Sequence, residues 1–345
     1  MSRVTIKDVA QKAGVSITSV SFAYNNPNRL PEETVQKILE VAEELGYVPN
    51  PIARSMLTGR TGVIGILVPQ PITEIIRNPI MEEFIEGVAE VCLREGYSIL
   101  LVPPFEGSVK RAAAKTAVDG FITLGLELYK STILILQQRK VPFVIVDTDP
   151  VDGISSVNIT DKKGAYSIMK YVLEQGHRRI GILGIRSGKM GKFEEYTGTL
   201  RGRIDGFQEA LSEYGLSLND PIIKYYECSS TMRGGEEGFN YLYSQDLSLT
   251  CIISMSDIIA FGVILAANQK GLKIPHDVSV TGFDDVPYAE ISCPALTTVS
   301  QPLREKGKTA ANLLVNHLCG KTEVTQRVFK TGLVIRDSVK DLRAE

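Results

Sequence analysis

Five polar side chains stand at the ends of predicted buried strands or at the starts of loops, where a polar ligand could bind. They are Asp147, Arg203, Ser256, Asp257 and Asp284. Asp147 follows the apolar run 144–146, and Asp284 follows Thr281-Gly-Phe283. Carboxylates and a guanidinium group make many strong hydrogen bonds, as a polyhydroxylated ligand requires. Because parallel α/β sheets bind ligands outside the carboxyl ends of their strands, these residues predict one ligand site.

Catalysis, helix capping and phosphate binding are the alternatives to a ligand site. Asp284-Asp285 could act as general acid and base, but adjacent carboxylates at a strand end suit ligand binding equally well. Asp257 precedes a predicted helix, so a capping role explains it as well as ligand contact does. Gly184-Ile-Arg-Ser-Gly-Lys189 differs from a phosphate loop because only three residues separate its glycines. The sequence therefore predicts a protein that is not an enzyme and needs no metal or cofactor.

The elements that must position these side chains are buried strands alternating with helices. Apolar runs occur at 63–68, 98–102, 120–124, 142–146, 180–183, 251–254 and 278–281. Strands without polar alternation, separated by helical stretches, indicate parallel sheets covered by helices on both faces. Two such series in 345 residues predict two α/β lobes.

The first 25 residues have the pattern of two short helices joined by a tight turn. The first helix has an apolar stripe of Ile6, Val9, Ala10 and Ala13, and the second has Val20, Ala23 and Tyr24. Thr5 and Ser16 stand at the N-cap positions, and Gly14 ends the first helix. The pattern alone fits a helix-turn-helix, whose second helix enters the DNA major groove, and equally any helical hairpin.

A third helix and a short fourth helix are predicted next. The third runs from about Glu32 to Leu45, with an inward stripe of Val35, Ile38, Leu39, Ala42 and Leu45. Pro49-Asn-Pro51 then interrupts regular structure. Residues 52–57 could form one or two helical turns or remain a plain linker, because a helix this short is marginal in isolation.

Charge and cysteine content restrict the location of the protein more than its function. The net charge is only −2, although residues 1–30 carry four basic side chains and one acidic side chain. The five cysteines are scattered and lack a C-x-x-C pair, which is typical of reduced thiols in a cytosolic protein. Neither a signal peptide nor a membrane span is recognisable. We therefore expect a cytoplasmic protein without a membrane partner.

Spaced motifs along almost the whole chain resemble one family of proteins. They are Val4-Thr-Ile-Lys-Asp-Val-Ala10, Ala13-Gly-Val-Ser16, Val20-Ser21, Asn25, Glu44-Leu-Gly-Tyr-Val-Pro-Asn50, Ala53-Arg-Ser55 and Arg203-Ile-Asp-Gly-Phe207. Together they resemble the LacI/GalR family of bacterial repressors, and further matches reach about Arg336. The resemblance is specific because a dozen motifs fall in the order that the family has.

The resemblance implies an α/β fold with an N-terminal all-α helix-turn-helix head and two Rossmann-like lobes of the periplasmic-binding-protein-like type I fold. The implied boundaries are 1–48 for the head and 49–61 for a hinge helix and linker. The N-terminal lobe would comprise 62–157 plus 288–322, and the C-terminal lobe 158–287 plus 323–340. Three crossovers, near 157–160, 286–291 and 321–325, would join the lobes, with an effector bound between them.

The implied function is control of transcription by binding a pseudo-palindromic operator in double-stranded DNA as a homodimer. The effector between the lobes would be a small polar molecule, with a sugar or sugar derivative first and a nucleobase or other metabolite second. A solute-binding protein of a transport system shares the two-lobe fold, but it would lack residues 1–60 and carry a signal peptide. The sequence gives neither the operator nor the direction of the effector's action.

The resemblance also implies which residues contact DNA. They are Thr5, Ser16, Ile17, Thr18, Ser19, Ser21, Phe22, Asn25, Thr34, Asn50, Ala53 and Met56. Ile17, Thr18 and Phe22 would read bases, and Phe22 stands where the family often has Arg. Met56 stands where the family usually has a Leu that wedges between bases. Phe22 as a core residue and Met56 as a packed linker residue remain the alternatives.

Three features depart from the family or concern assembly. Residues 103–118 are too few for the usual helix, so the rim of the cleft is expected to differ. Ser256 stands where the family usually has Asn. The resemblance implies that the helix 79–95, with Ile80, Phe84, Ile85, Val88 and Val91, and the stretch near 275–290 pair across the two-fold axis of the dimer. The last residues lack apolar heptads, so a tetramer is not expected.

Overall fold

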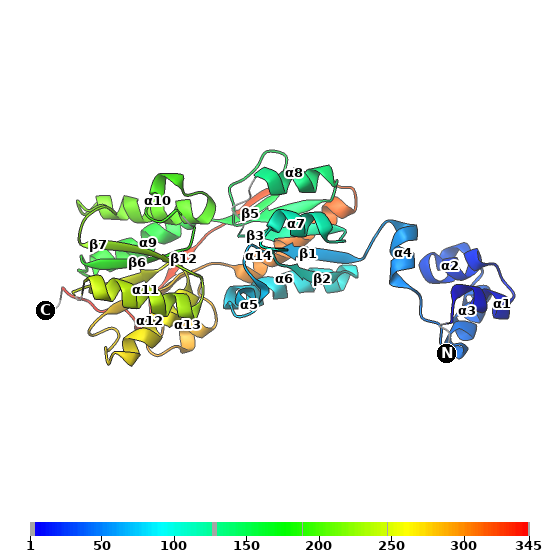
Figure 1. The fold of residues 1–345 in the computed structure, drawn as a ribbon, viewed down its shortest axis with the longest axis horizontal. Coiled ribbons are helices and arrows are strands. Elements are labelled where there is room, and N and C mark those ends of the chain that lie inside the picture. The colour runs from blue at the N-terminus through cyan, green and yellow to red at the C-terminus, as the bar shows by residue number, and fades with distance from the viewer. Residues whose placement is uncertain (1–3, 126–129, 188, 247, 344–345) are drawn as a thin grey trace. The chain divides into compact units, whose positions relative to one another are not determined.

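The computed structural model describes residues 4–125, 130–187, 189–246 and 248–343. The chain divides into two compact units, Met1–Thr61 and Gly62–Glu345. The first unit is all-helical, and the second contains every strand of the described residues (Figure 1). No helix among those residues is long and apolar enough to cross a membrane.

The first unit is a three-helix head followed by a short helix. Helices α1 (Ile6–Ala13), α2 (Ile17–Asn25) and α3 (Glu32–Glu44) surround a small core, and a 3-10 turn (Pro27–Arg29) joins the last two. The core consists of Val9, Ala10, Ala13, Val20, Ala23, Ile38 and Ala42. This arrangement confirms the two predicted apolar stripes. Leu39 was expected in the third stripe, but it is exposed.

The turn between α1 and α2 follows from its local residues. Gly14 has φ +68°, a left-handed conformation that glycine adopts without strain. Thr5 donates backbone and hydroxyl hydrogen bonds to Oδ2 of Asp8, each 2.8 Å long. Ser16 caps α2, since its Oγ accepts a 3.0 Å hydrogen bond from the Ser19 amide. These bonds explain why two short helices form here.

The helix α4 (Pro51–Thr58) realises the fourth predicted helix. Asn50 caps its start, because the Ile52 amide donates a 3.0 Å bond to Oδ1 of Asn50. Gly59, at φ +69°, ends it.

The second unit contains two sheets, each covered by helices on both faces. The first sheet has strand order β11-β5-β4-β3-β1-β2, and all of its paired strands are parallel. Its strands are β1 (Val63–Leu67), β2 (Ser98–Val102), β3 (Gly120–Leu124), β4 (Phe143–Val146), β5 (Ser156–Ile159) and β11 (Gln326–Phe329). Helices α6 (Pro79–Glu95) and α14 (Leu303–Leu318) pack on one face, and α7 (Val109–Lys115) and α8 (Lys130–Gln138) on the other. We call this sheet with its helices, including the short α5 (Ile72–Ile75), the first lobe.

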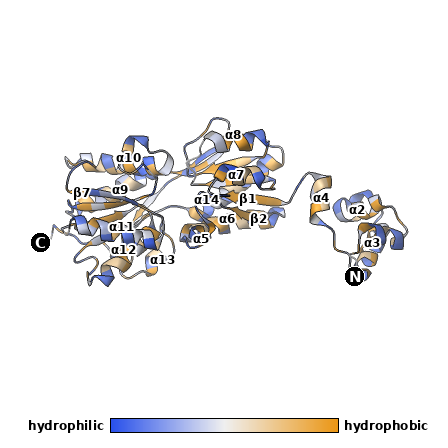
Figure 2. Cartoon of the chain, in the orientation of Figure 1, coloured by the Kyte–Doolittle hydropathy of each residue, from blue (hydrophilic) through white to orange (hydrophobic). Residues whose placement is uncertain are grey.

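The second sheet is also parallel, with strand order β7-β6-β8-β9. Its strands are β6 (Ile180–Ile185), β7 (Ile223–Cys228), β8 (Cys251–Ser254) and β9 (Ser279–Thr281). Helices α9 (Asp161–Glu174) and α10 (Gly198–Ser212) cover one face, and α11 (Met232–Gln245) and α12 (Asp257–Gln269) cover the other. With α13 (Tyr288–Ile291) they form the second lobe. Figure 2 shows strands such as β1 as apolar and the outer helix faces as polar, as parallel sheets between helices require.

The connections between the lobes differ from the prediction in two places. Ala289 and Leu296 belong to the core of the second lobe. The backbones of Asp284 and Ser300 form an isolated parallel β-bridge. Residues 288–300 therefore belong to the second lobe, and the crossover predicted at 286–291 is wrong. Strand β11 pairs with β5 in the first sheet, so residues 326–329 belong to the first lobe and the crossover predicted at 321–325 lies too early.

Both crossovers were misplaced because the strands that define them, β10 and β11, are short and lack a run of apolar residues. Strand β10 (Thr298–Ser300) has three residues and pairs antiparallel with β12 (Gly332–Val334), and Val299 and Leu333 pack on the core of the second lobe. Strand β11, with sequence Gln-Arg-Val-Phe, has no apolar run and is mostly exposed. Neither segment carries the signal of a buried strand.

Three of the apolar residues named for the dimer surface lie on the buried side of α6. Phe84, Val88 and Val91 are fully buried in the core of the first lobe, so they cannot contribute to a dimer surface. Leu93 of the same helix is 86% exposed and is available.

Candidate DNA interface and effector site

The start of α2 presents the residues that were predicted to read bases. Ile17 is 45% exposed, and Thr18 is also exposed. Phe22 is half-buried and does not belong to the core of the head. The guanidinium carbon of Arg29 lies 5.3 Å from the centre of its ring. The alternative in which Phe22 is a core residue is therefore not supported.

The hydroxyl and amide groups predicted to hold phosphates lie near the helix termini and bond to one another. Oγ of Ser16 and Oγ of Ser19 are 2.9 Å apart, and Asn25 donates a 3.0 Å bond to the Ser21 carbonyl. Thr34 is half-buried in the first turn of α3. Local hydrogen bonds therefore hold the side chains of Ser16, Ser19 and Asn25 in place.

The helix α4 exposes an apolar surface that a monomer leaves uncovered. Met56 is 83% exposed, Leu57 75% and Ile52 70%. Ala53 is exposed on the same short helix, and Asn50 lies at its start. Such an apolar surface on eight residues is typical of a segment that binds a partner.

The second unit contains a cavity of about 650 Å³ between its two lobes. Four of the five predicted effector residues line it, Asp147 from the first lobe and Arg203, Ser256 and Asp284 from the second. Ser108, Val109 and Lys110, from the shortened segment, line it as well. The structure thus brings together residues that lie up to 137 positions apart, at the carboxyl ends of both sheets.

Asp257 does not line the cavity. It is fully buried, where its Oδ2 accepts a 2.9 Å hydrogen bond from the Val286 amide and its Oδ1 a 2.5 Å bond from the Thr298 hydroxyl. Its prediction as an effector contact is therefore wrong. The carboxylate instead fixes the loop after β9.

Arg203 is held from three sides. Its Nε donates a 2.9 Å hydrogen bond to Oδ1 of Asp161, and its Nη1 donates to the Met255 carbonyl. The guanidinium carbon lies 3.6 Å from the centre of the Phe283 ring. Helix α10, which carries Arg203, packs closely against α9. Gly206 makes this close packing possible, because a Cβ at this position would lie 2.2 Å from the Lys162 carbonyl oxygen.

A chain of hydrogen bonds joins the two aspartates of the cavity. Nζ of Lys306 lies 2.7 Å from Oδ2 of Asp147 and 2.6 Å from Oε1 of Gln301. Nε2 of Gln301 donates a 2.6 Å bond to Oδ1 of Asp284. Asp147 and Asp284 both have positive φ, of 56° and 135°, so their backbones are strained as residues at functional sites often are.

Burial changes the protonation of these carboxyl groups. It raises the pKa of Asp284 well above its ordinary value, although the charge of Arg203 acts in the opposite direction. It raises the pKa of Asp161 to about 6, again opposed by Arg203. Low-dielectric surroundings disfavour a charged carboxylate, so protons at this site are held more tightly than in water.

The sequence analysis did not find Lys306, Gln301 or Asp161. Lys306 lies in a helix and Gln301 in the crossover before it, so neither follows a strand directly. Asp161 is the first residue of α9, directly after the crossover from β5, and that position was its only signal. Three aromatic residues of the second unit, Phe105, Phe193 and Tyr196, do not line the cavity, and the last two pack against Tyr225 instead.

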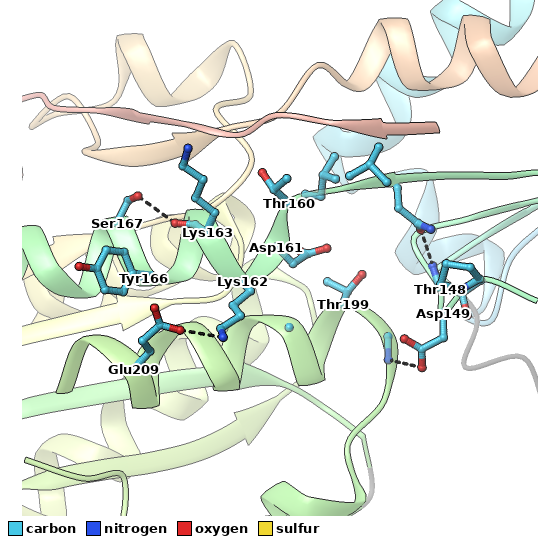
Figure 3. A pocket seen from close by; sticks show the side chains of 16 residues that line it. Thr148, Asp149, Thr160, Asp161, Lys162, Lys163, Tyr166, Ser167, Thr199 and Glu209 are labelled. Atoms are coloured by element: carbon cyan, nitrogen blue, oxygen red, sulfur yellow. Dashed lines mark hydrogen bonds and ion pairs between the residues drawn. The ribbon is translucent and has the colours of Figure 1, made fainter. Parts of the chain in front are cut away.

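A second cavity, of about 820 Å³, lies beside the first crossover (Figure 3). In it Lys162 and Glu209 form an ion pair of 2.7 Å. Oδ2 of Asp149, from the first lobe, accepts a 3.0 Å bond from the Gly198 amide of the second. Asp161 also lines this cavity, so its carboxyl group connects it to Arg203 in the first one.

The helix-turn-helix head and the polar cavity between two α/β lobes define the class of the protein, a DNA-binding regulator controlled by a small effector. Residues 5–50 match the model of bacterial regulatory proteins of the lacI family, and residues 169–339 match that of a periplasmic binding protein-like domain. The chain belongs to the LacI family. The predicted family, fold class and regulatory function are confirmed.

The relatives of this chain include the HTH-type transcriptional repressor PurR of Photobacterium profundum, 34% identical over 98% of this chain and 99% of the relative. The PurR of Vibrio vulnificus is 33% identical with the same coverage. Among solved structures, the transcriptional regulator CelR in complex with cellobiose is 26% identical, with a TM-score of 0.71 over 97% of this chain and 100% of the other. The lac repressor dimer bound to operator, at 22% identity and a TM-score of 0.79 over 98% and 100%, shows the shared fold.

Proposed function

We propose that this protein is a homodimeric transcriptional repressor whose effector is a sugar or sugar derivative bound in the cavity of about 650 Å³. The observation that carries the proposal is the set of polar groups that converge there from both lobes, Asp147 on one side and Arg203 and Asp284 on the other. A ligand that bonds to both sides favours lobe closure. Closure then changes operator affinity through a coupling between the two sites.

A sugar fits these groups better than a nucleobase does. Carboxylates and a guanidinium group bind hydroxyls densely. Bases are commonly held by stacking on aromatic rings. Among the described residues that line the cavity none is aromatic. The CelR structure contains cellobiose, and a LacI family regulator of Enterococcus faecium, 24% identical, contains ribose.

The DNA contacts are proposed on the predicted residues. Ile17, Thr18 and Phe22 would face base edges, where Phe22 packs on thymine methyl groups instead of pairing with guanine as an arginine would. The hydroxyl and amide groups around them would bind phosphates. Asn50 and Ala53 would lie against the minor groove, and Met56 would insert between base pairs at the operator centre.

Homodimer formation would cover some of the apolar residues that are exposed on the second unit. Leu93 is 86% and Ile291 77% exposed, and Tyr288 is 44% exposed. Two copies would then read a pseudo-palindromic site. Because the assigned sites account for regulation, we propose that the protein has no enzymatic activity and acts in the cytoplasm, where its operator is.

A thermal-shift screen tests the effector proposal. Ribose, glucose, galactose and cellobiose are compared on wild type, Asp284→Ala and Asp285→Ala. Asp285 is the matched control, since it pairs with Arg336 at 2.8 Å and does not line the cavity. We expect a sugar to stabilise wild type and the control but not Asp284→Ala. Nucleobases are included as non-sugar ligands. Equal stabilisation of all three proteins, or stabilisation of wild type by nucleobases alone, contradicts the proposal.

A further inference from the structure

Lys306 is a lysine on the buried face of a helix. It is the fourth residue of α14, and it shares that face with Leu303, Gly307, Ala310 and Leu314. Its side chain is 0% exposed. Lysine is almost never fully buried unless its charge is paired, so this residue requires an explanation.

The position of Lys306 is fixed by backbone packing. A Cβ on Gly307 would lie 2.1 Å from the Phe84 carbonyl oxygen, so α14 lies directly against α6. Nζ therefore points away from α6 to the end of β4, where it bonds Oδ2 of Asp147 and Oε1 of Gln301. Gln301 in turn donates a hydrogen bond to Oδ1 of Asp284, so Lys306 also helps to fix the position of Asp284.

The charges around the cavity show what Lys306 does. Arg203 is paired with Asp161, so Lys306 is the cation that directly faces Asp147. Oδ2 of Asp147 is engaged by Nζ, while Oδ1 is buried and has no hydrogen-bond partner among the described residues. A carboxylate left unpaired in such a site would attract a cation. Because Lys306 compensates the negative charge of Asp147, the free Oδ1 can accept a hydrogen bond from an uncharged ligand.

We propose that Lys306 is a specificity-determining residue of the effector cavity, because its ammonium compensates Asp147 and so makes the cavity select an uncharged hydroxyl ligand over a protonated amine. This inference rests on the proposed function. Lys306 does not contact the ligand itself, as it does not line the cavity. It acts by positioning Asp147 and, through Gln301, Asp284.

Matched sugar pairs test the inference. D-glucose and D-galactose are compared with their 2-amino analogues by calorimetry on the full-length protein. The variants are Lys306→Met, which removes the charge but keeps an apolar stem, and Lys306→Met combined with Asp147→Asn. Lys308→Met is the control, because Lys308 lies on the same helix but is half-exposed and pairs with Glu90 at 3.5 Å.

We expect wild type and Lys308→Met to bind the uncharged sugar more tightly. In Lys306→Met, the ratio of amine affinity to sugar affinity should rise at least about tenfold, because an uncompensated carboxylate attracts an ammonium at contact distance by more than that factor in a site less polar than water. Asp147→Asn in the same protein should return the ratio to the wild-type value, which a general packing defect would not do. An unchanged ratio in Lys306→Met, or a shift that survives Asp147→Asn, overturns the role of Lys306 alone. If wild type binds none of the sugars in the thermal-shift screen, this inference and the proposed effector class both fail.

Discussion

Nε of Arg203 donates a hydrogen bond of 2.9 Å to Oδ1 of Asp161, and this bond joins two cavities of the molecule. Arg203 lines the cavity between the lobes, and Asp161 lines the one beside the first crossover. The guanidinium plane is set by Asp161 on one edge and by the Phe283 ring on one face. Asp161 therefore positions Arg203, which we propose binds the effector, without lining the cavity between the lobes itself.

The first prediction concerns this positioning. Asp161→Asn should weaken binding of the effector sugar about tenfold, because a hydrogen bond to a charged group contributes about 1.5–3 kcal/mol and its loss frees the guanidinium to turn. Calorimetry with the sugar that stabilises wild type measures the change. Asp205→Asn is the control, since Asp205 pairs with Arg201 on the exposed face of α10 at 2.9 Å. Equal affinities in wild type and Asp161→Asn would show that Asp161 has no such role.

The second prediction concerns base reading. Phe22→Arg should change the preferred half-site, because arginine pairs with guanine whereas phenylalanine can only pack on apolar edges. Selection of operators from random double-stranded DNA compares wild type, Phe22→Arg and Phe22→Leu. The leucine variant keeps an apolar side chain and should retain the wild-type preference. The same selected sequences for all three proteins would remove Phe22 from the reading surface.

The third prediction concerns the hinge. Met56→Ala should reduce operator affinity at least about tenfold and reduce the bend in the DNA, because alanine is too short to wedge between base pairs. Gel-shift and bending assays on the selected operator measure both quantities. Met190→Ala, which truncates a methionine that is 51% exposed in the other unit, should change neither. A Met56→Ala protein that binds and bends the operator as wild type does rules out the wedge.

The fourth prediction concerns pH. His177 is buried, with Nδ1 2.9 Å from the Thr250 hydroxyl and Nε2 3.1 Å from the Lys340 carbonyl oxygen, and burial lowers its pKa to about 4 from 6.5. Between these values the unfolded chain binds more protons than the folded chain, so the free energy of unfolding falls as the pH falls from about 6.5 to 4. The loss due to this residue is at most about 3 kcal/mol.

Urea denaturation at several pH values checks this prediction. His177→Asn should be less stable than wild type at pH 7 but should lose less stability between pH 6.5 and 4. His276→Asn, which changes an exposed histidine, should keep the wild-type slope. If His177→Asn also keeps that slope, protonation of His177 does not account for the acid sensitivity.

Local patterns in the sequence predicted the head well because its structure depends on local contacts. The apolar stripes of α1 and α2, the caps Thr5 and Ser16, and Gly14 all act within a few residues. The two α/β lobes were predictable for a similar reason, since most of their buried strands are apolar runs. Strands β5 and β7 contain polar residues and were not predicted.

The remaining features depend on contacts between distant segments. Lys306 meets Asp147 across 159 positions, and nothing in the sequence around either residue indicates the pairing. Asp257 follows a strand as Asp284 does, but Val286 and Thr298 draw its carboxylate into the core. The crossovers were misplaced because β10 and β11 are recognised only by the strands with which they pair.

We propose that a ligand bound at Asp284 changes the affinity of the head for DNA. The most direct test is the dissociation constant for the selected operator, measured by fluorescence anisotropy with and without the stabilising sugar, for wild type and Asp284→Ala. We predict a change of at least about fivefold in wild type, in either direction, which is the low end of known couplings between sites, and none in Asp284→Ala. No change in wild type, or an equal change in both proteins, would contradict the account.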